Sequence, residues 1–283
     1  MSKASQIMLS IATIFFVVIG LPLIYYQHLH LESNIRAIAI ETFTEAFQPM
    51  SEARYHDPIR KWNGIERVCL IHKDSEKLSH EIESFLNLIS ENLNHNFRVF
   101  KVSDIIGCDQ HSSKIFIVLS NEGNESSQKE YLSKIFDKRV AESYYQFGPL
   151  KGMSLTEAYP SNLTYIFVST ETLNGDNEDA LYVALEEISH SLLGGGDVVT
   201  DSIVSILGED ASGIDSENWY ERNPRGLCMI DLMYFELLLG DLPPDKRRFS
   251  EVLDFFSDNY DDVSMRAIAL KEVFLPYLDK RCS

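Results

Sequence analysis

The chain has 283 residues, long enough for one large domain or two small ones with a hydrophobic core. Apolar residues make up 45% and charged residues 24%, so collagen-like, coiled-coil and wholly disordered chains are excluded. The formal charge of −18, from 25 Lys and Arg against 43 Asp and Glu, argues against a nucleic-acid partner and against a broad surface for anionic lipid, because both need clustered basic side chains.

The N-terminal segment is predicted to anchor the chain in a membrane. Ile7–Tyr26 is a run of about 20 residues without a charge, which is long enough to cross a bilayer as a helix. Lys3 precedes the run and the next basic residue is Arg36, so the N-terminus is expected in the cytoplasm and the remaining chain outside. A cleaved signal peptide is the alternative, but it requires a small-residue cleavage site, and Tyr-Tyr-Gln-His-Leu-His follows the run instead.

Three parts are therefore expected along the chain. Residues 1–30 form the transmembrane anchor, residues 31–59 a juxtamembrane helix and linker, and residues 60–283 the main domain. The juxtamembrane helix is amphipathic and ends at Pro49, and its apolar side is formed by Ile35, Ile38, Ala39, Phe43, Ala46 and Phe47. The sequence thus predicts a single-pass protein of the cell inner membrane whose main domain is periplasmic or extracellular.

Residues 60–194 predict an α/β layer, a mixed sheet with packed helices. Strands are expected over 67–72, 97–102, 114–119 and 164–169. Helices are expected over 75–93, 127–145 and 178–193. The resulting order β-α-β-β-α-β-α places the chain in the α+β class.

Residues 195–283 predict a mainly helical part, because strand signals fade after Gly194. Helices are expected over 227–239, 249–256 and 263–278, with an acidic turn at 257–262. The four cysteines, Cys69, Cys108, Cys228 and Cys282, form no CxxC motif, so a zinc knuckle is not supported. In an oxidising compartment they allow three pairings, of which Cys228–Cys282 is favoured; four reduced, buried cysteines are the alternative.

Acidic residues are concentrated in one part of the main domain. Residues 152–221 contain fourteen Asp and Glu and no Lys or Arg. Such a stretch creates a negative field that could attract a metal ion or a basic partner. A solvated acidic surface that keeps the domain soluble is the plainer interpretation.

One helix of this acidic stretch carries a chemically suggestive pattern, Glu186-Glu187-Ile-Ser-His190. Glu186 and His190 are four residues apart, so they lie on the same side of a helix and could hold one metal ion. Glu187 lies about 100° around the helix and could activate a bound water. Metallopeptidases use H-E-x-x-H, and here glutamate replaces the first histidine. An amphipathic helix with a wet polar face would show the same spacing.

The strand, this helix, the glycine-rich turn and the later helices resemble the zincin-like arrangement of metallopeptidases. More closely, residues 60–242 resemble a family of bacterial envelope proteins, the domain of unknown function 2927. Matching stretches are Arg60–Trp62, Glu186–Gly194, Asp201–Ser205 and Ile230–Leu239. The resemblance implies a zincin-like fold with a weakened or lost metal site, since members carry Glu-Glu where peptidases carry His-Glu. This chain keeps His190, which leaves zinc binding open.

The third metal ligand is not identified by the sequence. The extended metallopeptidase patterns expect glycine and histidine where Leu193 and Gly196 stand. Asp197 and Asp201 are substitutes for that ligand, although turn and cap roles are the plainer interpretation of both. Gly194 is expected to end the helix in a left-handed conformation, and Asp231 to cap the helix that follows.

Two main functions remain at this point. The first is a membrane-anchored envelope protein whose zincin-like domain binds a protein or peptide partner, or acts as a scaffold, without catalysis and without a cofactor. The second is a zinc-dependent peptidase in which Glu186 and His190, with Asp197 or Asp201, hold zinc while Glu187 polarises water. A structural subunit of an envelope assembly is a third, plainer hypothesis.

Overall fold

A computed structural model describes residues 21–48, 59, 65–72, 75–108, 113–120, 131–136, 152–156, 163–170, 177–195, 198–199, 205–209, 224–243, 245–246 and 248–282. By compactness the chain forms two units, Met1–Thr42 and Phe43–Ser283. Helix α2 (Leu21–Phe47) contains the border, so its last turn belongs to the second unit.

The expected membrane span falls mainly outside the described residues. Residues 7–20 of that span are not described, and residues 21–26 form the first turns of α2. Within the part of the chain that the structure describes, no helix is both long enough and apolar enough to cross a membrane.

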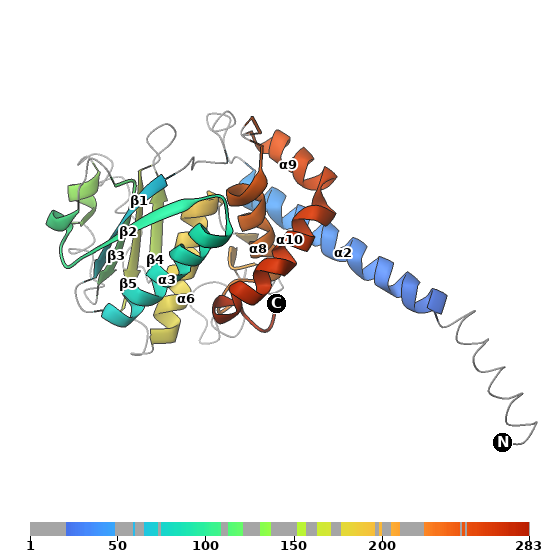
Figure 1. The fold of residues 1–283 in the computed structure, drawn as a ribbon, viewed down its shortest axis with the longest axis horizontal. Coiled ribbons are helices and arrows are strands. Elements are labelled where there is room, and N and C mark those ends of the chain that lie inside the picture. Colours follow the sequence, from blue (N-terminus) through green and yellow to red (C-terminus); the bar gives the residue numbers. More distant parts are fainter. Residues whose placement is uncertain are drawn as a thin grey trace, which may run out of the picture. The chain divides into compact units, whose positions relative to one another are not determined.

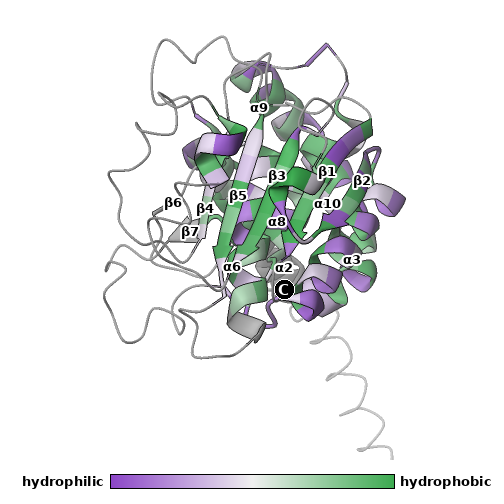
Figure 2. Ribbon diagram, turned by 90° about the vertical axis from the view of Figure 1, so that its left-hand side faces the viewer, coloured by the Kyte–Doolittle hydropathy of each residue, from purple (hydrophilic) through white to green (hydrophobic). Residues whose placement is uncertain are grey.

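A mixed five-stranded sheet lies at the centre of the second unit, in the order β2-β1-β3-β5-β4 (Figure 1). The strands are β1 (Ile65–His72), β2 (Asn96–Val102), β3 (Ile115–Ser120), β4 (Gly152–Thr156) and β5 (Thr164–Ser169). All neighbouring strands are parallel except β4, which runs antiparallel to β5. Every residue of β3 and β5 is buried, and β3 is strongly hydrophobic in Figure 2, as central parallel strands require.

The two faces of the sheet are covered differently. Helices α3 (Glu76–Asn92) and α6 (Asn177–Leu193) pack side by side on one face (Figure 1). The other face forms a core with η3 (Ile105–Gly107) and the helical residues 131–135. The Cys69–Cys108 disulfide joins β1 to the segment after η3 inside this core.

The C-terminal part is helical, as predicted. Its elements are α8 (Met229–Phe235), a wider π-type turn η5 (Glu236–Asp241), α9 (Phe249–Asp258), α10 (Tyr260–Val273) and η6 (Leu275–Tyr277). The aromatic rings of Phe43, Phe47, Tyr234, Phe249 and Phe256 pack together between α8, α9 and the last turn of α2. Two short strands, β6 (Val198–Val199) and β7 (Gly208–Glu209), pair with each other outside the main sheet.

The predicted α+β class with a mixed sheet is confirmed, and two details of the prediction are corrected. Strand β4 was not predicted, because its half-exposed Gly-Met-Ser-Leu-Thr sequence has little strand character alone. The expected acidic turn at 257–262 is wrong: Asn259 alone separates α9 from α10, and Asp261 and Asp262 lie in the first turn of α10, where acidic side chains favour the helix dipole. Of the helix expected over 127–145, only residues 131–136 are described.

Candidate functional site

Helix α6 carries the three central residues of the predicted site, Glu186, Glu187 and His190. The helix packs against β4, β5 and α3. Its apolar side is formed by Ala184, Leu185, Ile188 and Leu192, which are buried, and by Leu181, which is half-buried. On the polar side, Tyr182 and Val183 are each only 3% exposed, while Glu186 and Glu187 are half-buried. The face that carries Glu186 and His190 is thus largely covered rather than wet.

His190 lies at the C-terminal end of α6 and is 9% exposed. Its ring nitrogen Nδ1 is 3.2 Å from the carbonyl oxygen of Gly195, the second residue after the helix. Gly194 has a φ of 78°, and its N–H donates to the carbonyl oxygen of His190 at 2.8 Å. The prediction that Gly194 ends the helix in a left-handed conformation is confirmed.

Glu187 faces the edge strand β4. A Cβ atom at Gly152 would overlap Val183 and would lie 2.8 Å from Glu187 Oε1. Glycine at this position therefore lets α6 approach the first residue of β4 closely. The carboxylate of Glu187 lies in this narrow contact between helix and strand.

Of the five predicted site residues, the structure brings three onto one helix and leaves two undetermined. Asp197 and Asp201 lie outside the described residues. Within the described ranges, no three His, Cys, Asp or Glu side chains are grouped in a way that could hold a metal ion. The third ligand that the zinc hypothesis requires thus stays a prediction.

Asp231 forms a buried polar network that the sequence suggested only in part. One carboxylate oxygen accepts the hydroxyl of Ser205 at 2.5 Å, and the other accepts the backbone N–H groups of Ile206 at 2.8 Å and Cys228 at 2.6 Å. The expected capping role is confirmed, but Asp231 acts from the third position of α8, while Cys228 is the N-cap residue. The network joins two of the stretches, Asp201–Ser205 and Ile230–Leu239, on which the family resemblance rests.

Burial raises the pKa of the Asp231 carboxyl to about 6, against the lowering effect of its three hydrogen bonds and of nearby His190. Since His190 acts on Asp231, the C-terminal end of α6 lies within electrostatic range of the start of α8. The pKa of Tyr182 is raised well above its usual range, chiefly by burial and next by Glu186. Asp231, Asp279 and Arg281 also act on Tyr182, so Tyr182 lies within electrostatic range of these three residues.

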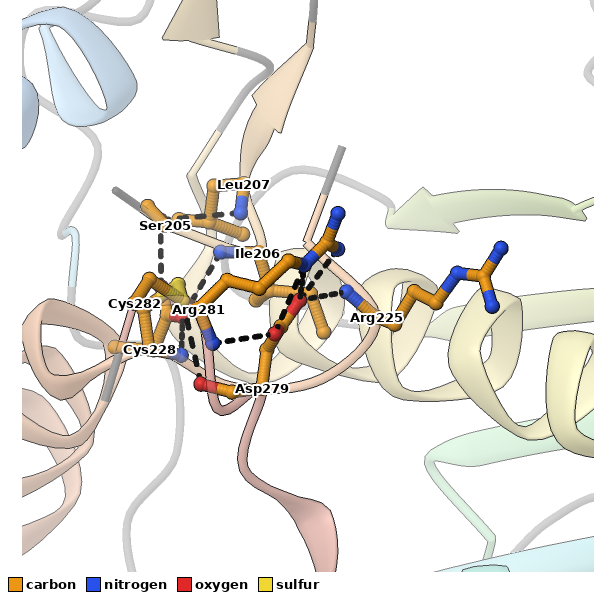
Figure 3. Close-up of a disulfide and its surroundings, with 9 residues drawn as sticks. Ser205, Ile206, Leu207, Arg225, Cys228, Asp279, Arg281 and Cys282 are labelled. Atoms are coloured by element: carbon orange, nitrogen blue, oxygen red, sulfur yellow. Dashed lines mark hydrogen bonds and ion pairs between the residues drawn. A yellow bond between two sulfur atoms is a disulfide. The ribbon is translucent and has the colours of Figure 1, made fainter. Parts of the chain in front are cut away.

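The C-terminal segment is held in place by a disulfide and an ion pair (Figure 3). The Cys228–Cys282 bridge ties it to the start of α8, which confirms the favoured pairing. A β-bridge joins Leu227 to Leu278. Asp279 accepts the backbone N–H of Arg225 at 2.5 Å and is paired with Arg281, whose Nη2 lies 2.6 Å from Asp279 Oδ2. These contacts fix the segment that lies within electrostatic range of Tyr182.

No family model, curated protein or solved structure matches this chain. The resemblance to the domain of unknown function 2927 and to zincins therefore stays a prediction from the sequence. The geometry of α6 is therefore the basis for assigning a function to this site.

Proposed function

We propose that this chain is a membrane-anchored protein of the bacterial envelope, with a zincin-like domain that acts as a non-catalytic binding or scaffold module. One observation carries this proposal: the α6 face with Glu186 and His190 is covered. A peptidase has to admit water and a peptide to its metal ligands, and its catalytic zinc keeps one open coordination position. Here Tyr182 and His190 are 3% and 9% exposed, and a disulfide-bound segment lies within electrostatic range of Tyr182.

Two further features support parts of the proposal. The mixed sheet with one antiparallel edge strand beside α6 agrees with the α/β layer that the zincin resemblance implies. All four cysteines are paired, as Cys69–Cys108 and Cys228–Cys282, which suits an oxidising compartment such as the periplasm. The uncharged run Ile7–Tyr26 in the sequence supports the anchor.

A zinc-dependent peptidase is the second candidate function, and one contact favours it. Histidine ligands of zinc commonly donate their other ring nitrogen to a backbone carbonyl, which orients the imidazole. The contact of His190 Nδ1 with the carbonyl oxygen of Gly195 is of this kind and would direct Nε2 to a metal. In this candidate Glu186 completes a pair of ligands, Asp197 or Asp201 supplies the third, and Glu187 would take a proton from the attacking water.

Metal content separates the two candidates. The full-length chain is purified without a tag from zinc-supplemented cells and measured by elemental analysis, beside His190→Ala. His80→Ala is the matched control, because it removes an exposed histidine of α3 whose neighbours are Glu83 and Lys101. We expect less than 0.1 equivalent of zinc in all three proteins, the limit set by unspecific binding. About one equivalent that disappears only in His190→Ala would overturn the proposal in favour of the peptidase.

A further inference from the structure

One row of side chains on α10 is exposed, although three of its five members are apolar. Met265 is 62% exposed, Ile268 is 57% exposed, and Leu275, in the η6 turn that follows the helix, is 58% exposed. Asp261 and Glu272 are exposed as well. Successive members of this set are separated by four, three, four and three residues, so they lie on one side of the helix. We call Asp261, Met265, Ile268, Glu272 and Leu275 the α10 stripe.

The spacing of the α10 stripe is that of a contact between two helices. A repeat of four and three residues places side chains where a second helix can pack along them, whereas single exposed apolar residues are ordinary on a protein surface. The opposite side of α10 already serves the fold, because Val263, Ala267 and Leu270 are buried and the helix packs against α8. Helix α10 thus has two apolar sides, and the described part of the chain covers only one of them.

The exposed charges of α10 are acidic. Its three acidic residues, Asp261, Asp262 and Glu272, are all exposed. Its two basic residues are half-buried, and one of them, Arg266, is paired with a buried glutamate of η5. Because Asp261 and Glu272 belong to the stripe itself, they favour a partner with basic side chains beside its apolar ones. The net charge of −18 favours the approach of the same kind of partner.

We propose that the α10 stripe is a docking surface for a basic amphipathic helix of a partner protein. Apolar side chains of that helix pack on Met265, Ile268 and Leu275, and its lysine or arginine side chains pair with Asp261 and Glu272. In contacts of this kind the apolar row supplies affinity, and the charges set the orientation and the choice of partner. The proposal goes beyond the function proposed above, because it does not use α6 and holds whether or not that helix binds zinc.

A second copy of the chain is a poorer occupant of the stripe. A parallel pair of α10 helices would set Asp261 against Asp261 and Glu272 against Glu272. The antiparallel pairing that brings Met265 onto Ile268 would set Asp261 against Glu272. In each arrangement acidic side chains meet, which opposes association. A bilayer is a poorer occupant as well, because it would have to accommodate the two carboxylates of the stripe among its apolar contacts.

Peptide binding by the full-length chain in a non-ionic detergent tests the proposal. The probe is a fluorescein-labelled helical peptide of three heptads, with leucine at both seam positions and lysine at the flanking positions. A second peptide carries glutamate in place of lysine. We expect the lysine peptide to bind and the glutamate peptide to bind at least tenfold more weakly. Ile268→Gln should weaken binding of the lysine peptide at least tenfold, and Glu272→Lys should reduce the preference for lysine over glutamate.

Each variant has a matched control outside the stripe. Ile106→Gln removes an isoleucine of η3 that is 85% exposed, and Glu91→Lys changes the charge of an exposed glutamate of α3. Both controls should leave peptide binding unchanged. Because all four substituted side chains are exposed, the variants should fold, which far-ultraviolet circular dichroism checks.

Four outcomes would overturn the proposal. In the first, the lysine peptide does not bind. In the second, it binds Ile268→Gln as tightly as Ile106→Gln, or the glutamate peptide binds as tightly as the lysine peptide, which would make the attraction unspecific. In the third, the chain without peptide sediments as a dimer that Ile268→Gln dissociates, which would assign the stripe to a second copy. In the fourth, the lysine peptide binds the chain in detergent but not in phosphatidylcholine nanodiscs, which would assign the stripe to the bilayer.

Discussion

In the central sheet, β3 and β5 contain no charged residue and every one of their side chains is buried. In the C-terminal part, three carboxylates are buried instead: Asp231, Glu236 and Asp279. Each has polar partners, which are Ser205 and two backbone N–H groups for Asp231, Arg266 for Glu236, and Arg281 for Asp279. Apolar burial is nondirectional and does not depend on pH, whereas a buried carboxylate stabilises the fold only while its partners stay in place.

This difference predicts how the stability of each region responds to the loss of a side chain. Loss of an apolar side chain in the sheet leaves a cavity and costs free energy at any pH. Loss of one partner in the C-terminal part leaves an unsatisfied buried group, and its cost varies with protonation. The following variants test this contrast, in decreasing order of expected effect on the free energy of unfolding.

The largest effect is expected for Asp231→Ala. The substitution removes the acceptor for the backbone N–H groups of Ile206 and Cys228 and for the hydroxyl of Ser205, all of them buried. At about 1–3 kcal/mol for each unsatisfied buried donor, the free energy of unfolding should fall by about 4 kcal/mol. Urea denaturation followed by circular dichroism measures this loss.

Ile117→Ala in β3 is the matched sheet variant, because Ile117 is an apolar residue that is fully buried. It should cost about 3 kcal/mol, equally at pH 7 and pH 5. If Asp231→Ala costs less than about 1 kcal/mol, the network is not a stabilising element of the C-terminal part and the contrast between the regions fails.

The second effect concerns the two disulfides. Cys282→Ser opens the bridge between residues 54 apart, and Cys108→Ser opens one between residues 39 apart, so each should cost about 3 kcal/mol. The variants should differ in where the structure loosens. Only Cys282→Ser releases the C-terminal segment whose Asp279 and Arg281 act on Tyr182, so only this variant should make Tyr182 reactive towards tetranitromethane, as measured by peptide mass spectrometry. Equal nitration of Tyr182 in both variants would show that the segment does not protect it.

The contrast between apolar burial in the sheet and polar burial in the C-terminal part also explains which features could be predicted from the sequence. Residues 164–169 were predicted as a strand with the bounds that β5 has, because a central parallel strand is a short apolar run that needs no knowledge of its neighbours. The favoured pairing of Cys228 with Cys282 was likewise confirmed. Strand β4 was missed because it depends on pairing with β5, which its own five residues do not encode.

The long-range polar contacts could not be predicted from the sequence, for a related reason. Asp231 was recognised as a capping residue, but nothing local indicates that Ser205, 26 residues earlier, supplies a hydrogen bond to it. The register that places Arg67 opposite Arg98 is equally hidden, since it depends on how two strands align. The burial of this face of α6 was partly visible in Tyr182 and Val183, which interrupt its polar side, whereas Asp279 and Arg281, which act on Tyr182, lie about 100 residues later.

Within the C-terminal part, two buried aspartates have pKa values shifted in opposite directions. Burial raises the pKa of Asp231 to about 6. Burial also acts to raise the pKa of Asp279, but the hydrogen bonds from Arg281 and from the backbone N–H of Arg225 outweigh it and hold the pKa below its ordinary value. Acidification should therefore favour the folded state through Asp231 and disfavour it through Asp279.

The smallest of the three effects is the pH dependence that Asp231 contributes, and Asp231→Asn isolates it. The folded pKa of about 6 lies above the unfolded value of 3.8, so between these values the folded chain binds more protons than the unfolded chain. The stabilisation is full below pH 3.8 and is lost as the pH rises through 6. The free energy of unfolding of the wild type, relative to Asp231→Asn, should thus fall by about 2 kcal/mol from pH 4 to pH 7. Chemical denaturation at both pH values measures the difference. Asp279→Asn is the control, because the lowered pKa of Asp279 places its titration below this pH range, so the stability of the wild type relative to Asp279→Asn should change little between pH 4 and pH 7. If the difference in stability between the wild type and Asp231→Asn is the same at both pH values, Asp231 has the same pKa in the folded and the unfolded chain. The effect of burial on this pKa would then be fully offset by the three hydrogen-bond donors.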